Sequence, residues 1–201
     1  MPSIILASAS PRRAELLQQI GLNFSVRPAD IDETPEPDET PEHYVERLAR
    51  EKALVVAGSS PECLVLGSDT SVVLDGEILG KPSDFTEARE TLARLSGATH
   101  QVMTAVALAT EGQCQSVLVN TEVCFRELSE GEIEAYVASG EPMDKAGSYG
   151  IQGLGGIFVN ELRGSYSAVV GLPLQETAAL LAGAGYPVWK NWPRSLESQK
   201  L

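Results

Sequence analysis

Small hydroxyl residues and two arginines stand close to the start of the chain, in the stretch Ser8-Ala9-Ser10-Pro11-Arg12-Arg13. An apolar run precedes them, and proline is typical of the first position of a helix, so we expect a strand that leads through a loop to a helix N-terminus. Amides of a first helical turn carry partial positive charge, and guanidinium groups bind phosphate or carboxylate. Because two arginines in a first turn oppose the helix dipole, a bound anion would explain them. The stretch indicates an anion site, although a plain turn with solvated arginines fits these residues equally well.

Isolated lysines and carboxylates elsewhere in the chain could complete such a site. Lys52, Lys81 and Lys145 could bind further phosphate oxygens, while Glu33 and Asp69 could hold a cation or activate water. Together these are the groups of a metal-dependent enzyme that acts on a polyphosphate. Each also has an ordinary explanation, since a lysine beside an apolar helix stripe usually reaches solvent and an acidic loop is usually solvated. The sequence contains no Walker A motif and no cysteine or histidine in a recognisable nucleophile setting.

The expected position of Asp69 depends on the element that carries it. Residues 63–70 form an apolar run that ends in glycine and small polar residues, so we expect a buried strand with Asp69 at its carboxyl end. Ligands bind at that edge of open α/β sheets. Residues 71–79 contain Asp75-Gly76 between apolar runs, which predicts a two-residue hairpin that returns Lys81 toward the level of Asp69.

The remaining elements follow an α/β pattern. Thr40 and Pro41 form a helix start, and a regular apolar stripe continues that helix to Gly58. The acidic, proline-rich residues 28–41 predict a solvated loop, and the glycine-rich residues 143–156 predict a loop whose backbone passes close to a ligand. The other expected elements are helices over 11–20, 84–96, 129–140 and 171–182, strands over 23–27, 99–109, 115–126 and 157–162, and a small polar loop over 164–167.

The overall composition bounds the partners of the chain. Its 201 residues are 43% hydrophobic, enough to bury a core as a single domain over 1–201 with two closely joined lobes. It has 15 Lys and Arg against 28 Asp and Glu, and this net charge of -13 argues against binding to nucleic acid or to an anionic membrane. A small phosphorylated ligand needs only a local cluster of positive charge, so it remains compatible.

Targeting and metal-binding cysteine signals are absent from the sequence. No signal segment or membrane-spanning run occurs, so we expect a cytoplasmic protein, either a monomer or a homodimer. Cys63, Cys114 and Cys124 have no metal-like spacing and are expected to be buried free thiols. We assign no chemistry to His43 or His100, and we expect residues 195–201 to be a frayed tail.

Five short motifs stand in order along the chain. They are Ser8-Ala9-Ser10-Pro11-Arg12-Arg13, Gly67-Ser68-Asp69-Thr70, Gly80-Lys81-Pro82, Lys145-Ala146-Gly147 with Tyr149-Gly150-Ile151-Gln152-Gly153, and Val170-Gly171-Leu172-Pro173. Together they resemble the Maf family of nucleoside triphosphate pyrophosphatases, from residue 3 to about Ala182. The resemblance implies an α/β fold with a mixed central sheet flanked by helices, in two lobes around a cleft, similar to the inosine triphosphate pyrophosphatases. It also implies hydrolysis of a nucleoside triphosphate between the α and β phosphates, with a divalent metal.

The resemblance also assigns roles to the matching residues. Asp69 becomes the general base, Glu33 with Asp69 would hold Mg²⁺ or Mn²⁺, and the phosphate contacts become Ser8, Arg12, Arg13, Lys52 and Lys81. This set is chemically reasonable, because a loose phosphoryl transition state needs charge neutralisation and alignment more than a protein nucleophile.

Three positions look like the branch of the family that acts on dTTP and UTP, namely Arg12, Thr70 and Gln152. The branch that prefers methylated GTP carries tyrosine and glutamine in place of the first two. A glutamine amide can offer a donor and an acceptor to the O4 and N3 edge of uracil or thymine, so Gln152 is the expected base reader. The implied role is removal of modified pyrimidine nucleotides. The alternative is a regulator of cell division that binds nucleotide without essential turnover.

Overall fold

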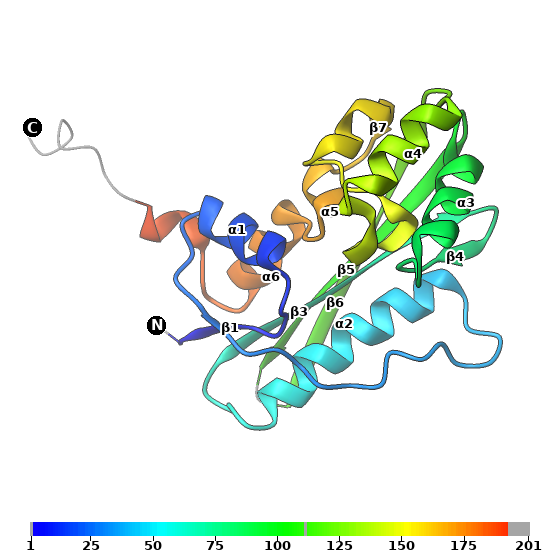
Figure 1. The fold of residues 1–201 in the computed structure, drawn as a ribbon. Coiled ribbons are helices and arrows are strands. Elements are labelled where there is room, and N and C mark those ends of the chain that lie inside the picture. The colour runs from blue at the N-terminus through cyan, green and yellow to red at the C-terminus, as the bar shows by residue number, and fades with distance from the viewer. Residues whose placement is uncertain (1, 111, 193–201) are drawn as a thin grey trace, which may run out of the picture.

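A mixed sheet of seven strands forms the centre of the protein, in the order β2-β1-β3-β5-β6-β7, with β4 beside β3. The structure is a computed structural model that describes residues 2–110 and 112–192, so the expected tail over 195–201 lies outside it. The strands are β1 (Ile4–Leu6), β2 (Ser25–Val26), β3 (Leu64–Leu74), β4 (Glu77–Leu79), β5 (Thr99–Thr110), β6 (Gln113–Phe125) and β7 (Val159–Arg163). The α-helices are α1 (Pro11–Gln19), α2 (Pro41–Ala57), α3 (Phe85–Leu95), α4 (Glu130–Ala138), α5 (Tyr166–Val170) and α6 (Leu174–Gly183). The expected mixed sheet flanked by helices is confirmed (Figure 1).

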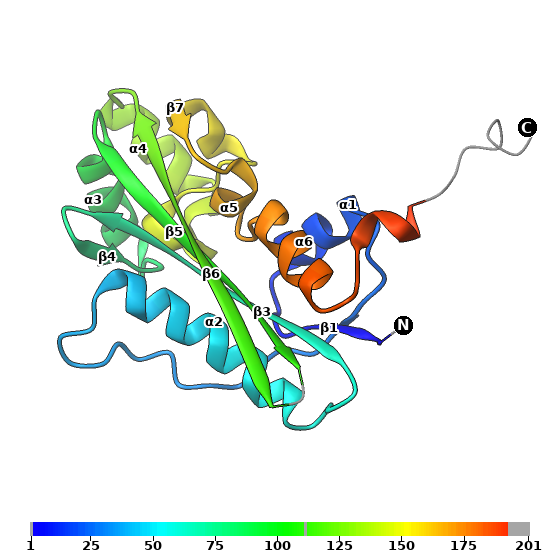
Figure 2. The ribbon, with the colours of Figure 1, turned by 180° about the vertical axis from the view of Figure 1, so that it is seen from behind.

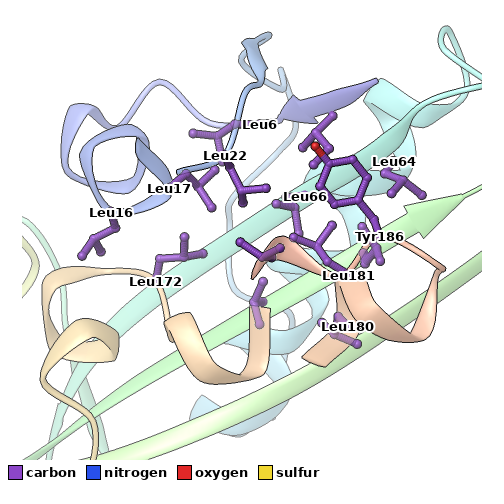
Figure 3. Packing of buried hydrophobic residues seen from close by; sticks show 14 of the residues in the cluster. Leu6, Leu16, Leu17, Leu22, Leu64, Leu66, Leu172, Leu180, Leu181 and Tyr186 are labelled. Atoms are coloured by element: carbon purple, nitrogen blue, oxygen red, sulfur yellow. The ribbon is translucent and has the colours of Figure 1, made fainter. Parts of the chain in front are cut away.

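Side chains that alternate along β3 divide the apolar core between the two faces of the sheet. On one face, Val65 and Val73 pack with the apolar stripe of α2, which lies along the sheet in Figures 1 and 2. On the opposite face, Leu64 and Leu66 pack with α1 and α6, as Figure 3 shows, while Val72 and Leu74 pack with α3 and α4. Between these pairs the same face carries Ser68 and Thr70, so a polar stretch separates the two apolar clusters.

Predicted helix starts and turns are confirmed where the local chemistry is strong. Thr40 accepts a hydrogen bond from the amide of His43 (3.4 Å), and a capping box joins Ser129 to Glu132 at the start of α4. Asp75 and Gly76 have positive φ angles of 51° and 81°, as a two-residue hairpin between β3 and β4 requires.

The structure corrects the expected strand over 63–70. β3 continues unbroken to Leu74, so Asp69 lies in the middle of a strand and not at its carboxyl end. Gly67 is required by helix packing, since a Cβ there would overlap the carbonyl oxygen of Ala49 and lie 2.7 Å from the backbone nitrogen of Ala53. Glycine at this position marks a close crossing of α2 over β3, and the sequence pattern alone resembles a strand end.

One edge of β3 contains a gap between two partner strands. β1 pairs with Leu64–Leu66 and β4 pairs with Val72–Leu74, while β5 lies along the other edge from Val65 to Val73. Residues 67–71 therefore have no strand partner on the first edge among the described residues. Asp69 points to the α2 face here and Thr70 to the α1 face, so both faces of the strand are accessible from the gap.

Three further expectations change in detail. The small polar loop over 164–167 is the start of α5, because the Ser165 hydroxyl accepts a hydrogen bond from the amide of Ala168 (3.2 Å). The glycine-rich segment folds largely into short 3₁₀ turns, η1 (Glu141–Asp144), η2 (Ala146–Ser148) and η3 (Leu154–Phe158), and η4 (Val188–Asn191) follows α6. All three cysteines are free but half-buried.

Within residues 2–110 and 112–192, no helix has both the length and the apolar character to cross a membrane.

Candidate active site

A cavity of about 620 Å³ lies at the gap between β1 and β4. Its lining comes from the loop before α1, the middle of β3, the loop after β4, and the segment between α4 and β7. The structure brings all of the candidate residues from the sequence into this one cavity: Ser8, Arg12, Arg13, Glu33, Lys52, Asp69, Thr70, Lys81 and Gln152.

Lys52 joins the two candidate carboxylates. Its Nζ lies 2.8 Å from Oδ1 of Asp69 and 2.7 Å from Oε1 of Glu33. Lys52 and Asp69 are each only 8% exposed, so this lysine is not the solvated surface residue that its helix position allows. Burial raises the pKa of Asp69 above its ordinary value, against the opposing charges of Lys52 and Arg13, and a raised pKa makes the carboxylate a better proton acceptor.

The geometry around Lys52 also bears on a divalent metal. Two carboxylate oxygens converge on one cation, and hard oxygen ligands of this kind suit Mg²⁺ or Mn²⁺. Across the described ranges, no group of three or more His, Cys, Asp or Glu side chains forms a metal cluster. Glu33 and Asp69 offer two carboxylate groups, and Mg²⁺ is usually held by one or two carboxylates together with substrate phosphates.

The acidic loop that carries Glu33 is fastened to α2. Arg47 donates from Nε to Oε1 of Glu39 (2.7 Å) and from Nη2 to the carbonyl oxygen of Thr34 (3.1 Å). The hydrogen bond from Arg47 lowers the pKa of Glu39 to about 2, and Tyr44 donates its hydroxyl to the carbonyl oxygen of Glu33 (2.9 Å). This role of Arg47 cannot be predicted from the sequence, because no spacing rule links a helix arginine to a loop that folds back on it.

The two arginines of α1 have different surroundings. Arg13 donates to the carbonyl oxygen of Gly171 (2.8 Å) and to the hydroxyls of Ser8 (3.1 Å) and Thr70 (3.3 Å). Among the described residues, Arg12 has one ion-pair partner, Asp144, with Nη1 and Oδ2 3.6 Å apart. Arg13 therefore ties the loop before α1 and Gly171 to β3, while Arg12 lines the cavity beside Asp144.

The opposite wall carries Lys81 and Gln152, both exposed. The amide of Gly147 donates to the carbonyl oxygen of Gly80 (3.1 Å), which holds the lysine loop against η2. Asp144 also lines this wall, and it lies 2.7 Å from Nζ of Lys145 as well as close to Arg12. Sequence reasoning missed Asp144, although its place beside Lys145 in the glycine-rich segment was a signal. The neighbouring carboxylates of Asp32 and Glu33 have different partners. Glu33 contacts Lys52, whereas the carboxylate of Asp32 accepts a hydrogen bond from the amide of Thr34 (2.9 Å) in a local turn.

Comparison with known proteins places this geometry in a family. Residues 3–184 match the family described as Maf-like protein. The chain is 56% identical over 183 residues to a dTTP/UTP pyrophosphatase of Pseudoalteromonas atlantica, across 89% of this chain and 95% of that protein. It is 55% identical over 197 residues to a dTTP/UTP pyrophosphatase of Anaeromyxobacter dehalogenans, across 96% of this chain and 98% of that protein.

A solved structure gives an independent likeness of fold. A HAM1 protein from Coxiella burnetii aligns with 91% of this chain and 100% of its own, with a TM-score of 0.52 at 17% sequence identity. That identity supports the shared architecture alone. The family match over nearly the whole chain, together with relatives that are more than half identical, shows that the chain belongs to the Maf family.

Proposed function

We propose that the chain hydrolyses dTTP and UTP, together with modified pyrimidine triphosphates, to the nucleoside monophosphate and pyrophosphate. The observation that carries this proposal is a buried Lys52–Asp69 pair in a cavity that also holds Arg12 and Lys81. The relatives named dTTP/UTP pyrophosphatase give it further support. A binding protein would use the cations but has no evident use for a buried carboxylate with a raised pKa among them.

Phosphate binding is assigned to the cationic side chains on both walls. Arg12 from α1 and Lys81 from the loop after β4 both line the cavity, and Lys52 from α2 contacts the Asp69 carboxylate that lines it too. Ser8 and Arg13 complete the set, with the Ser8 hydroxyl already oriented by Arg13. Cations fixed in advance around a triphosphate stabilise the charge of the transition state without reorganisation during the reaction.

Asp69 is the proposed general base. A water oxygen forms a bond to a phosphorus of the α–β anhydride, the bond from that phosphorus to the bridging oxygen breaks, and the bridging oxygen keeps the electron pair. Asp69 accepts the proton of the water, and Lys52 holds the carboxylate in place through its 2.8 Å contact. A divalent cation held by Glu33 and Asp69 would neutralise phosphate charge when bound.

Recognition of the base is assigned to Gln152, Thr70 and Arg12. The Gln152 amide lies at the cavity with its side chain exposed, where it could pair with the O4 and N3 edge of uracil or thymine. A site of this kind would accept canonical and modified pyrimidine nucleotides, which supports a role in removing modified nucleotides before they are incorporated.

The test is a panel of canonical and modified nucleoside triphosphates assayed with Mg²⁺, with Mn²⁺ and with a chelator. We expect metal-dependent release of pyrophosphate, fastest with dTTP, UTP and their modified analogues. Release of orthophosphate would contradict the proposed reaction. Tight binding of UTP without turnover would favour the nucleotide-binding regulator of cell division.

A further inference from the structure

Glu141, at the start of η1, holds the segment that carries Gln152. Its Oε2 accepts a hydrogen bond from the amide of Leu154 (2.9 Å), and its Oε1 accepts one from the amide of Gly155 (3.2 Å). Burial alone would raise the pKa of Glu141, but these amides and the hydroxyl of Tyr136 hold it below its ordinary value. Glu141 is therefore a charged acceptor for the first two backbone amides of η3 (Leu154–Phe158), where the amides of a helix start lack partners within the helix.

Tyr136, on α4, holds the other end of the same segment. Its hydroxyl donates to Oε1 of Glu141 (2.9 Å) and accepts a hydrogen bond from the amide of Gly150 (3.1 Å). The ring is only 4% exposed and packs edge-on against Phe158, with 4.9 Å between the ring centroids. The buried Tyr136 and the half-buried Glu141 thus fix both ends of the segment from Gly150 to Gly155.

The glycines of the segment show how closely the backbone passes this unit. A Cβ at Gly153 would lie 2.5 Å from both carboxylate oxygens of Glu141, and one at Gly155 would lie 2.8 Å from the Tyr136 hydroxyl. A Cβ at Gly150 would lie 2.6 Å from Cε of Lys145. The glycine pattern of the motif therefore reflects the backbone wrapped around Glu141, in addition to any approach to a ligand.

Gln152 lies between the two fixed ends and lines the cavity, whereas Glu141 and Tyr136 do not line it. We propose that Glu141 and Tyr136 are positioning residues for base recognition, which hold the segment from Gly150 to Gly155 in the conformation that presents Gln152 to the pyrimidine. This inference rests on the proposed function, because it takes Gln152 as the base reader. An amide on a segment that can move would no longer distinguish the N3 and C4 edge of uracil from that of cytosine.

The first experiment compares kcat/KM for UTP and CTP in the full chain. In Glu141→Gln an NH₂ group replaces one of the acceptor oxygens, so one backbone amide or the Tyr136 hydroxyl loses its partner. We expect Glu141→Gln and Tyr136→Phe to lower the ratio of kcat/KM for UTP to that for CTP about tenfold, mainly through KM for UTP, and we expect the same of Gln152→Ala. Adding Glu141→Gln to Gln152→Ala should change the ratio by less than about twofold, because both changes remove the same interaction.

The second experiment measures amide hydrogen exchange in residues 150–155. We expect exchange about tenfold faster in Glu141→Gln. Glu134→Gln is the matched control, since Glu134 is an exposed residue of α4 and its change should leave both exchange and the UTP to CTP ratio as in the wild type. Unchanged exchange in Glu141→Gln would overturn the anchoring of the segment.

The remaining outcomes separate this inference from the proposed function. If Gln152→Ala lowers the ratio and Glu141→Gln lowers kcat/KM equally for both nucleotides, the role of Glu141 is structural and the inference is wrong. If Gln152→Ala leaves the ratio unchanged, base reading by Gln152 fails, and the positioning role for base recognition fails with it. Pyrophosphate release from UTP would stand in both cases.

Discussion

The two walls of the cavity are built in different ways. On the wall formed by the loop before α1, α1 itself and β3, charged and hydroxyl side chains bind one another, as in the contacts of Arg13 with Ser8 and Thr70. On the wall between α4 and β7, the backbone amides of Gly150, Leu154 and Gly155 are bound by side chains that do not line the cavity. The first wall fixes charges in space, and the second fixes a stretch of main chain.

This difference predicts what a substitution on each wall will change. Loss of a charged group on the first wall removes interactions with phosphate, which every nucleoside triphosphate shares. Loss of an anchor on the second wall changes the presentation of a base-reading side chain, so its effect depends on the nucleotide. Loss of Asp69 should therefore lower the rate for every nucleotide and loss of Arg13 should lower stability, whereas loss of Glu141 or Tyr136 should lower discrimination between bases.

The largest effect is expected for Asp69→Asn. An amide cannot accept the proton of the attacking water, so kcat should fall about 1,000-fold for every nucleotide, within the range typical of a general base. Steady-state pyrophosphate release measures this loss, with circular dichroism to verify folding. A folded Asp69→Asn protein with wild-type kcat would show that the first wall binds phosphate without supplying the base.

Arg13→Ala and Arg12→Ala should separate two functions on the first wall. Arg13 makes three hydrogen bonds to groups from distant parts of the chain, and their loss should lower the free energy of unfolding by about 3 kcal/mol. Among the described residues, Arg12 makes one long, partly exposed ion pair. The free energy of unfolding of Arg12→Ala should therefore stay within about 0.5 kcal/mol of the wild-type value, and KM should rise instead. Urea unfolding and steady-state kinetics measure both quantities. Equal effects of the two variants on stability and on every nucleotide would contradict the distinction.

Acid stability should report on the core behind the second wall. His100 is 1% exposed, its Nε2 lies 2.8 Å from the Tyr149 hydroxyl, and burial lowers its pKa to about 4. The unfolded chain takes up this proton near pH 6.5, so stability present above pH 6.5 is lost as the pH falls toward 4, by about 3 kcal/mol in total. Urea unfolding between pH 7.5 and 4 gives the free energy of unfolding at each pH. The contribution of His100 is the difference in the slope of this free energy against pH between the wild type and His100→Gln. Parallel pH profiles would show that His100 does not contribute.

The smallest effect is expected for Asp144→Asn, and it has the opposite sign. The Asp144 carboxylate is ion-paired with Arg12 and Lys145, so it would compete with a substrate phosphate for both cations. Its side chain is 70% exposed, so the gain should be modest: KM for UTP should fall about twofold at low salt and return to the wild-type value at about 0.5 M salt. A higher KM in this variant would show that Asp144 assists substrate binding.

Elements with a strong local signal could be predicted from sequence alone. The caps at Thr40 and Ser129 and the Asp75-Gly76 turn are decided by a few adjacent residues, and the structure has them where the sequence indicates. The unbroken course of β3 could not be predicted in this way. Gly67 is required because α2 crosses the strand closely at this point. That contact joins segments far apart in sequence, so the sequence itself shows only a glycine, which is also typical of a strand end.

The residues of the candidate site also fall into two groups, those that the sequence can predict and those that it cannot. Residues of the first wall stand in short motifs of charged and hydroxyl groups, so their chemistry is visible before the fold is known. Glu141 and Arg47 act on loops through contacts that only the folded chain creates, and a single glutamate or arginine in an acidic chain has no distinguishing pattern. The sequence pattern predicts a strand-end position for Asp69, yet Asp69 reaches the cavity because β1 ends early and, among the described residues, leaves the middle of β3 without a strand partner on that edge.

The gap between β1 and β4 also bears on solubility. Among the described residues, 67–71 of β3 have no strand partner on this edge, and such an edge can accept a strand from another chain, which is a route to aggregation. The Lys52–Asp69 ion pair stands on one face of the strand at this point and the Arg13 guanidinium on the other. An incoming strand would place its own side chains against these charges, which are already paired or hydrogen-bonded and would gain no new polar partner from an apolar side chain. The groups proposed to bind the nucleotide therefore also protect the sheet against edge-to-edge association.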